Sequence, residues 1–360
     1  MSNDNKRMNN LAADESKVDL SGGVDPGREY VIASQPEDPQ VRDAVNVWIE
    51  STDASFGMRI GIEALAKDWH AHDIWLDIAF ADGRVISFRE SHTPVPTADE
   101  RGYSSVRGAG PLQFRCVEPF RHWHVAFNGM APETTAQRLA AGIDQPDATP
   151  VKVAFDIDMK MVAPPWVPGS LRAEAREALA GQQGDFMSPR YEQLFRASGS
   201  LQVGDDRIAV TANGLRIRRQ GVRRLDEFCG HCWQSAVFPS GRAFGFITYP
   251  PRKDGQPAYN EGYIFDGSGE LKPATAVEIP WLDRLQEHGD DVSFVLATDY
   301  ERIQIEGETF INTRSVNKGS AILPTDFPIV QQAHGRYRWD GEETTGMVER
   351  SSPPSKIGDH

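Results

Sequence analysis

The sequence predicts an all-β protein made of two successive antiparallel domains of short strands, with only a few short helices. Residues 151–161 alternate apolar and polar side chains with a period of two, which is typical of a sheet with one solvated face. Turn signals such as Asp82-Gly83, Gly204-Asp205 and Ser240-Gly241 separate further strand-like runs. These patterns do not distinguish a closed barrel from a sandwich, so both architectures stay open.

The order of these patterns along the chain predicts five segments. Residues 1–27 are polar and Asn-rich, and we expect a disordered or loosely attached tail there. Strand patterns fill residues 28–165, the expected N-terminal domain. Residues 166–190 read as a helical connector, in which Ser170 is a candidate N-cap and Gly181 a candidate C′ residue. Strand patterns return over residues 191–350, the expected C-terminal domain, and residues 351–360 form a second tail.

The composition limits the partners and the compartment. A chain of 360 residues that is 39% hydrophobic can bury a sizeable core. Its formal net charge of -14 argues against nucleic acid or an anionic membrane as a partner. No apolar run approaches the roughly 20 residues that span a bilayer, and no apolar signal segment follows the N-terminal basic residues. With three cysteines and no disulfide framework, we expect a soluble, cytoplasmic protein.

Nucleotide-cofactor and serine-hydrolase motifs are absent from the sequence. There is no Gly-x-Ser-x-Gly elbow, no P-loop and no dinucleotide fingerprint between a strand and a helix. We therefore expect a protein without a cofactor. A homodimer stays open, because the sequence does not define the oligomeric state.

Five arginines between Arg216 and Arg224 form the densest cluster of charge. On a strand, Arg216 and Arg218 share one face and Arg219 lies on the other. Guanidinium groups are suited to clamp a carboxylate or phosphate on a ligand. The alternative is a set of ion pairs with acidic neighbours, which contribute little when exposed.

Two motifs suggest metal ligands but are incomplete. Cys229-Gly-His-Cys232 supplies two thiolates, whereas a structural zinc site needs four ligands. His122 and His124 share one strand face, as in a cupin-type iron site, but Phe127, Asn128 and Gly129 stand where the cupin glutamate belongs. We predict no metal site and keep a cupin-like metal dioxygenase as the weaker alternative.

Several stretches together resemble the tandem lipocalin-like family, which includes carotenoid 1,2-hydratase, AttH-type proteins and fungal decalin-forming cyclases. The resemblance covers most of residues 45–350. It rests on Trp48, Glu50 and Ser51 before FGMRIGI, on PLQFRCVEPFRHWHVAFNG, on YEQLFRASGSLQVGDDRIAVTANGLR and on the final RWDG and TGMVERS. The resemblance implies two lipocalin-like domains and a hydrophobic ligand.

One motif departs from the family pattern. Many relatives carry Gly-x-x-Asp-His-x-Trp-Gly at the long motif of the second domain. Here the segment runs from Gly214 to Gly221, with Ile217 and Arg218 in place of Asp and His and Gln220 in place of Trp. The fold inference survives this change, whereas the hydratase mechanism does not transfer. Arginine in that place suggests stabilisation of a carbonyl or carboxylate.

The function that the resemblance implies is a cofactor-independent enzyme acting on a terpenoid, steroid-like or polyketide-like molecule. The reaction would be hydration or dehydration, isomerisation or cyclisation, in an apolar cavity. A buried carboxyl has a raised pKa and can transfer a proton near neutral pH. A non-catalytic carrier of a similar ligand is the alternative. The candidate catalytic residues are Glu50, Glu192, Arg218 and His231, and the candidate ligand-binding residues are Trp123, His122, Tyr191, Arg216, Gln220 and Trp233.

Overall fold

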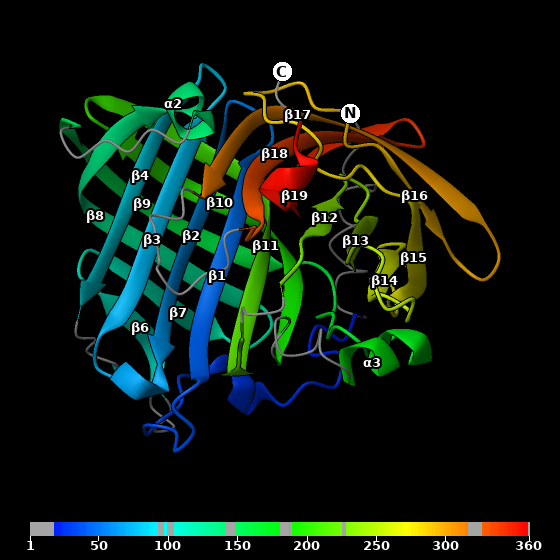
Figure 1. The fold of residues 1–360 in the computed structure, drawn as a ribbon. Helices are drawn as coiled ribbons and strands as arrows, with labels where there is room; N and C mark the ends of the chain where they lie inside the picture. The colour runs from blue at the N-terminus through cyan, green and yellow to red at the C-terminus, as the bar shows by residue number, and fades with distance from the viewer. Residues whose placement is uncertain are drawn as a thin grey trace, which may run out of the picture.

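The computed structural model describes residues 18–92, 97–98, 104–141, 148–180, 187, 189–224, 228–315 and 326–358. Antiparallel strands dominate these residues and form two sheets that lie side by side (Figure 1). The short helices are α2 (Ala136–Ala140) and α3 (Ala173–Ala180), with 3-10 turns η2 (Pro26–Glu29), η3 (Ala66–Asp68) and η4 (Pro354–Lys356). The predicted all-β class is therefore confirmed.

The first sheet has the strand order β4-β3-β2-β1-β11-β10-β9-β8-β7-β6-β5. Strand β4 also pairs with the end of β8, which closes the strands from β4 round to β8 into a ring, here called the first barrel. Its strands are β1 (Val41–Ser51), β2 (Phe56–Leu65), β3 (His72–Phe80), β4 (Arg84–His92), β5 (Thr97–Ala98), β6 (Ser104–Ala109), β7 (Leu112–Glu118), β8 (His122–Thr135), β9 (Pro150–Met161), β10 (Arg190–Val203) and β11 (Asp206–Val222).

The second sheet is a closed barrel, here called the second barrel, in which β12 pairs with β19. The sequence did not distinguish a barrel from a sandwich, and the structure shows a barrel. Closing the sheet leaves no unpaired strand edge. Its strands are β12 (His231–Val237), β13 (Ala243–Thr248), β14 (Asn260–Phe265), β15 (Lys272–Glu278), β16 (Phe294–Ala297), β17 (Arg302–Ser315), β18 (Ile329–Trp339) and β19 (Glu342–Ser352).

Strands β10 and β11 belong to the first sheet, although the sequence placed residues 191–222 at the start of the second domain. Strand β10 pairs with β9, and the whole of β1 pairs with β11. A strand pattern does not reveal which partner a strand will choose, so the pattern alone could not assign this hairpin. Sheet membership changes between β11 and β12, while the division into folding domains stays a prediction.

Alternating apolar and polar residues lie on opposite faces of β9, as the sequence predicts for a sheet with one solvated face. In β9, Phe155, Ile157 and Met159 are buried, while Asp156 and Lys160 are exposed. By contrast, every residue of β12 and β13 is buried. One face of each of these two strands fills the second barrel, and the other packs against the first barrel.

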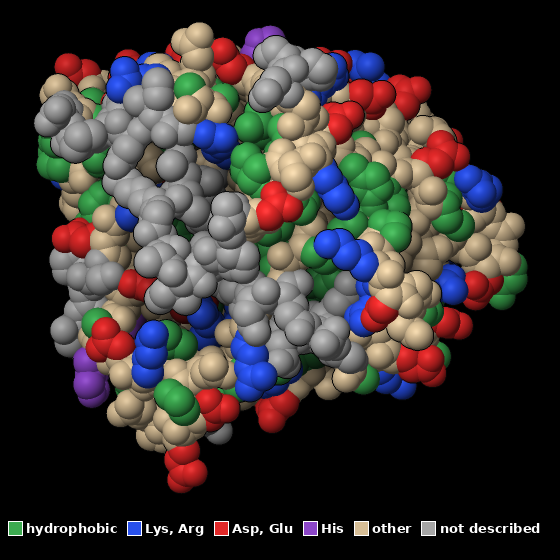
Figure 2. Space-filling view, viewed as in Figure 1, with side chains coloured by type: hydrophobic (Ala, Val, Ile, Leu, Met, Phe, Trp, Pro, Cys, Tyr) green, Lys and Arg blue, Asp and Glu red, His purple; other side chains and the backbone are tan. Residues whose placement is uncertain are grey.

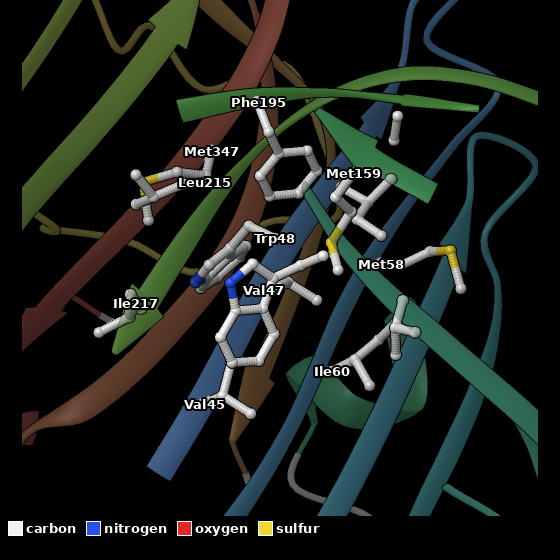
Figure 3. Close-up of a cluster of buried hydrophobic side chains, with 14 of the residues drawn as sticks. Val45, Val47, Trp48, Met58, Ile60, Met159, Phe195, Leu215, Ile217 and Met347 are labelled. Carbon is white, nitrogen blue, oxygen red and sulfur yellow. The ribbon is translucent and has the colours of Figure 1, made fainter. Parts of the chain in front are cut away.

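The two faces of β1 divide the hydrophobic core in the same way (Figure 3). Val45, Val47, Ile60 and other side chains pack on the face that lines the first barrel. Trp48 projects from the opposite face, as do Leu215 and Ile217 of β11. Met347 of β19, in the second barrel, packs beside them.

The N-terminal segment closes part of the first barrel, and residues 18–27 are not a loose tail. Val18 and Leu20 are buried, and Gln193 donates to the Leu20 carbonyl oxygen at 2.9 Å. The buried carboxylate of Glu29 pairs with Arg216 at 2.7 Å and accepts from Trp123 Nε1 at 2.7 Å. Burial opposes ionisation, but the charge of Arg216 and these hydrogen bonds hold the pKa of Glu29 below its ordinary value.

We expect Glu29→Gln to destabilise the fold by about 3–5 kcal/mol, because it leaves Arg216 buried without its counter-ion. Urea unfolding followed by circular dichroism measures this loss. Glu37→Gln removes the same charge from an exposed position and should change stability by less than about 0.5 kcal/mol. Equal effects of the two substitutions would show that the pair does not anchor the N-terminal segment.

Candidate functional site

A cavity of about 490 Å³ lies between the outer face of the first barrel and the outer face of the second. Strands β1, β2, β3, β4, β10 and β11 form its floor, and β12, β13 and β19 form its roof. The sites of small ligands are commonly concave and lie at such boundaries.

The strand register arranges the floor into rows of side chains that cross the sheet. Residues paired across neighbouring strands share a face, so each row can be read from the pairings. The arginine row is Arg190, Arg219, Ala44, Glu63 and Asp73. The next row is Glu192, Ile217, Asn46, Gly61, Trp75 and Arg89. The third row is Leu194, Leu215, Trp48, Arg59, Asp77 and Ser87.

Aromatic rings cover the middle of the floor. A Cβ atom on Gly61 would lie 2.1 Å from Trp75 Cζ2, so the indole crosses the strand where glycine leaves room. The Arg59 guanidinium lies 5.5 Å from the Trp75 ring centre and 5.7 Å from that of Trp48. Such stacks stabilise a cation and also present a flat apolar surface to a ligand.

The roof carries a histidine that is held at both ring nitrogens. His231 Nε2 lies 3.0 Å from Glu349 Oε1, and Nδ1 lies 2.8 Å from Ser351 Oγ. Burial opposes ionisation of Glu349, but the hydrogen bond and charge of His231 lower its pKa to about 2. The carboxylate is therefore charged at neutral pH and orients the imidazole on the cavity wall.

Glu192 lies next to the cavity, beneath two of the lining side chains. It pairs with Arg190 at 2.7 Å and accepts from Trp233 Nε1 at 3.0 Å. Arg190 also stacks over the Trp233 ring at 5.0 Å. Burial raises the pKa of Glu192 above its ordinary value, although Arg190 opposes this shift. Glu192 thus holds Arg190 and Trp233 in place.

The structure brings part of the predicted set together. His231 and Trp233 line the cavity, and Glu192 supports it. Glu50 is buried between the barrels, where its carboxylate lies 3.0 Å from His334 Nδ1 of β18. Burial raises the pKa of Glu50. His334 contacts Trp48, with ring centres 5.6 Å apart, so this pair lies behind the aromatic floor.

The other predicted residues lie away from the cavity. Arg218 points into the first barrel, where it binds Asp43 and donates to the Tyr30 carbonyl oxygen at 2.6 Å. Gln220 donates to the same carbonyl at 2.9 Å. Arg216, Tyr191 and Trp123 surround Glu29 on that inner face. His122 lies on the outer face of β8, where it binds Asp158 at 2.5 Å.

The cavity also contains residues that the sequence did not single out as site residues. Arg219, Arg190 and Glu349 line it, together with Arg59 and Trp75. The sequence did indicate that Arg219 lies on the other face of its strand from Arg216 and Arg218. It did not say which face of the strand would meet a ligand. The lining mixes charged and aromatic side chains and is more polar than the apolar cavity with one or two polar groups that the sequence led us to expect.

Two absences hold for the described residues. Within the ranges that the structure covers, no group of three or more His, Cys, Asp and Glu side chains is placed to hold a metal ion. In that same part of the chain, no helix has the length and apolar character needed to cross a membrane.

Known structures share this architecture. A candidate AttH protein from Nitrosomonas europaea matches with a TM-score of 0.54 and 14% identity, over 90% of this chain and 99% of that one. CghA in complex with Sch210972 matches with a TM-score of 0.52 and 10% identity, over 88% of this chain and 89% of that one. Similarity at this identity shows a common fold, and the class is therefore that of two-barrel, lipocalin-like proteins.

A family model covers nearly the whole chain. Residues 30–354 match the family described as a domain of unknown function, DUF7064, and the chain belongs to that family. No curated protein sequence matches this chain.

The Glu349 carboxylate makes the stability of the second barrel depend on pH. Its pKa in the folded protein, about 2, is below the ordinary value of 4.5. The stabilisation is therefore present above pH 4.5 and is lost as the pH falls through 2. We expect Glu349→Gln to lower stability by about 3 kcal/mol at pH 7 and progressively less below pH 5.

Urea unfolding at a series of pH values measures this difference. Glu343→Gln, on the same strand, removes an exposed carboxylate that lies 2.9 Å from Arg338. It should change stability by less than about 0.5 kcal/mol at every pH. A difference between Glu349→Gln and the unmodified protein that does not vary with pH would contradict the low pKa.

Proposed function

We propose that the chain is an enzyme that acts on a hydrophobic small molecule in the cavity between the barrels. The reaction is hydration or dehydration, isomerisation or cyclisation, and the substrate has a terpenoid, steroid-like or polyketide-like skeleton. The observation that carries the proposal is the His231–Glu349 pair facing an aromatic floor across one cavity.

The aromatic residues supply the binding surface. Trp48, Trp75, Trp233 and Tyr249 line the cavity, and a ring system stacked on them is held in one orientation. CghA, which shares the fold, was solved in complex with the small molecule Sch210972. That complex supports a ligand-binding role for this architecture.

His231 is the proton-transfer group of the proposal. Glu349 and Ser351 each bind one ring nitrogen of His231 and fix the orientation of the imidazole. Both nitrogens already have partners, so a ligand must replace one of them before a proton passes between the ring and the substrate. Glu192 acts indirectly, because it positions Arg190 and Trp233 rather than touching the cavity.

The runner-up function is a non-catalytic carrier of a similar ligand. Ile217 favours it, because this apolar side chain lines the cavity at the position where many lipocalin-like relatives have an aspartate. The same aromatic floor would hold the ligand, and no proton transfer would follow.

We expect a panel of apolar compounds to contain one that quenches Trp fluorescence and is converted, with mass spectrometry detecting the product. His231→Gln should lower turnover by about 10²–10⁴-fold and change the dissociation constant by less than about threefold. His124→Gln alters a histidine on the outer face of β8, beside Asp156, and should leave both quantities unchanged. Binding without turnover by the unmodified protein would favour the carrier.

A further inference from the structure

Arginines gather at one end of the cavity in a protein whose formal net charge is -14. Arg219 of β11 lies directly opposite Arg190 of β10, and Arg223 lines the same cavity. Like charges directly opposite each other on neighbouring strands are destabilising. On the face of the molecule that Figure 2 shows, acidic and basic side chains are intermingled.

Three carboxylates near Arg219 are paired with other cations. Glu63 of the arginine row binds Arg42, Glu349 binds His231 and Glu192 binds Arg190. Among the residues that the structure describes, no carboxylate oxygen lies within 4.0 Å of an Arg219 nitrogen.

Arg219 is nevertheless almost completely buried. Its side chain lines the cavity while the residue is only 4% exposed, and Nε has no hydrogen-bond partner. A buried charge without a partner is costly, and a ligand of opposite charge would remove that cost.

The pKa values of Arg219 and Arg223 also indicate that positive charge is unfavourable at this end of the cavity. Burial, with repulsion from Arg223 and Arg190, lowers the pKa of Arg219 well below its ordinary value. Burial also lowers the pKa of Arg223 to about 10. The cationic form of Arg219 is therefore destabilised in the free protein, and a negative charge beside it would reverse that effect.

We propose that Arg219, flanked by Arg190 and Arg223, is a subsite for a carboxylate group, and that the ligand of the cavity is an organic acid. This inference rests on the proposed function, because it assigns the substrate class of the same cavity. A planar monoanion matches the fork of a guanidinium group. Glu63 and Asp73 stand in the same row and disfavour the higher charge of a phosphate.

The register also sets the distance between the acid group and the ring system. Successive rows on one face are two residues apart, which is about 7 Å. Trp75 lies one row beyond Arg219 and three strands away, on β3, whereas Trp48 lies two rows beyond on β1, the strand next to β11. The Trp75 indole lies over Gly61 of β2, beside Asn46 of β1, which shortens the gap between the strands. An aromatic acid whose ring covers this indole directs its carboxylate towards Arg219.

A matched pair of probes tests the subsite. Calorimetric titration at neutral pH compares 2-naphthoate with 2-naphthamide, which has nearly the same shape and no charge. We expect the naphthoate to bind about tenfold or more tightly than the amide. Arg219→Met should remove this preference, change amide binding by less than about threefold and leave the fold intact, because it removes an unpaired buried charge.

Two further variants complete the test. Arg219→Lys keeps the charge but not the planar fork, so it should retain part of the preference, and it serves if Arg219→Met does not fold. Arg115→Met removes an exposed arginine of β7 outside the cavity and should retain all of the preference.

The outcomes separate the two proposals. Equal binding of the two probes, including no detectable binding of either at millimolar concentration, would overturn the carboxylate subsite. A preference that survives Arg219→Met would overturn it too. Failure of the proposed function gives a different result, namely preferential binding of the acid with no conversion of any bound compound.

Discussion

Strand β11 pairs with both β1 and β10, and the rest of the structure depends on this pairing. It completes the first barrel, and it decides which arginines enter that barrel and which face the second. Arg216 and Arg218 point inward, where Glu29 and Asp43 neutralise them. Arg219 points outward into the cavity. One strand therefore supplies both the ion pairs that hold the N-terminal segment and a charge that faces the cavity.

The two barrels pack through their outer faces, and both aromatic and ionisable side chains lie between them. Trp48 contacts Trp233 across it, with ring centres 6.3 Å apart. Glu50 pairs with His334, which occupies the space over Gly57, where a Cβ atom would lie 2.2 Å from the imidazole. These contacts close the interface at the row of Trp48 and at the next row, in which Glu50 is paired with Gly57, while it remains open at the arginine row. This difference along the strands creates the cavity.

The cavity separates two chemical tasks between its walls. The floor belongs to the first barrel and offers aromatic rings and arginines, which suit binding and orientation. The roof belongs to the second barrel and carries His231 with Glu349, which suit proton transfer. Strands β12 and β13 are buried on both faces because one face fills the second barrel and the other packs against the first. The cavity therefore exists only where the two barrels are packed together.

The sequence alone determined the all-β class, the turns and the alternation of faces, because these depend on short-range periodicity and on residues such as Gly83 and Gly204, whose φ angles of 90° and 60° suit tight turns. It also placed Arg219 on the face opposite Arg216 and Arg218. Only the tertiary structure decided that residues 190–222 join the first sheet and that Arg219, not Arg218, meets the cavity. The physical reason is that strand pairing and the packing of one barrel on another depend on contacts between residues far apart in the chain. The periodicity of a single strand shows which residues share a face, but it does not show which other strand or barrel that face will contact.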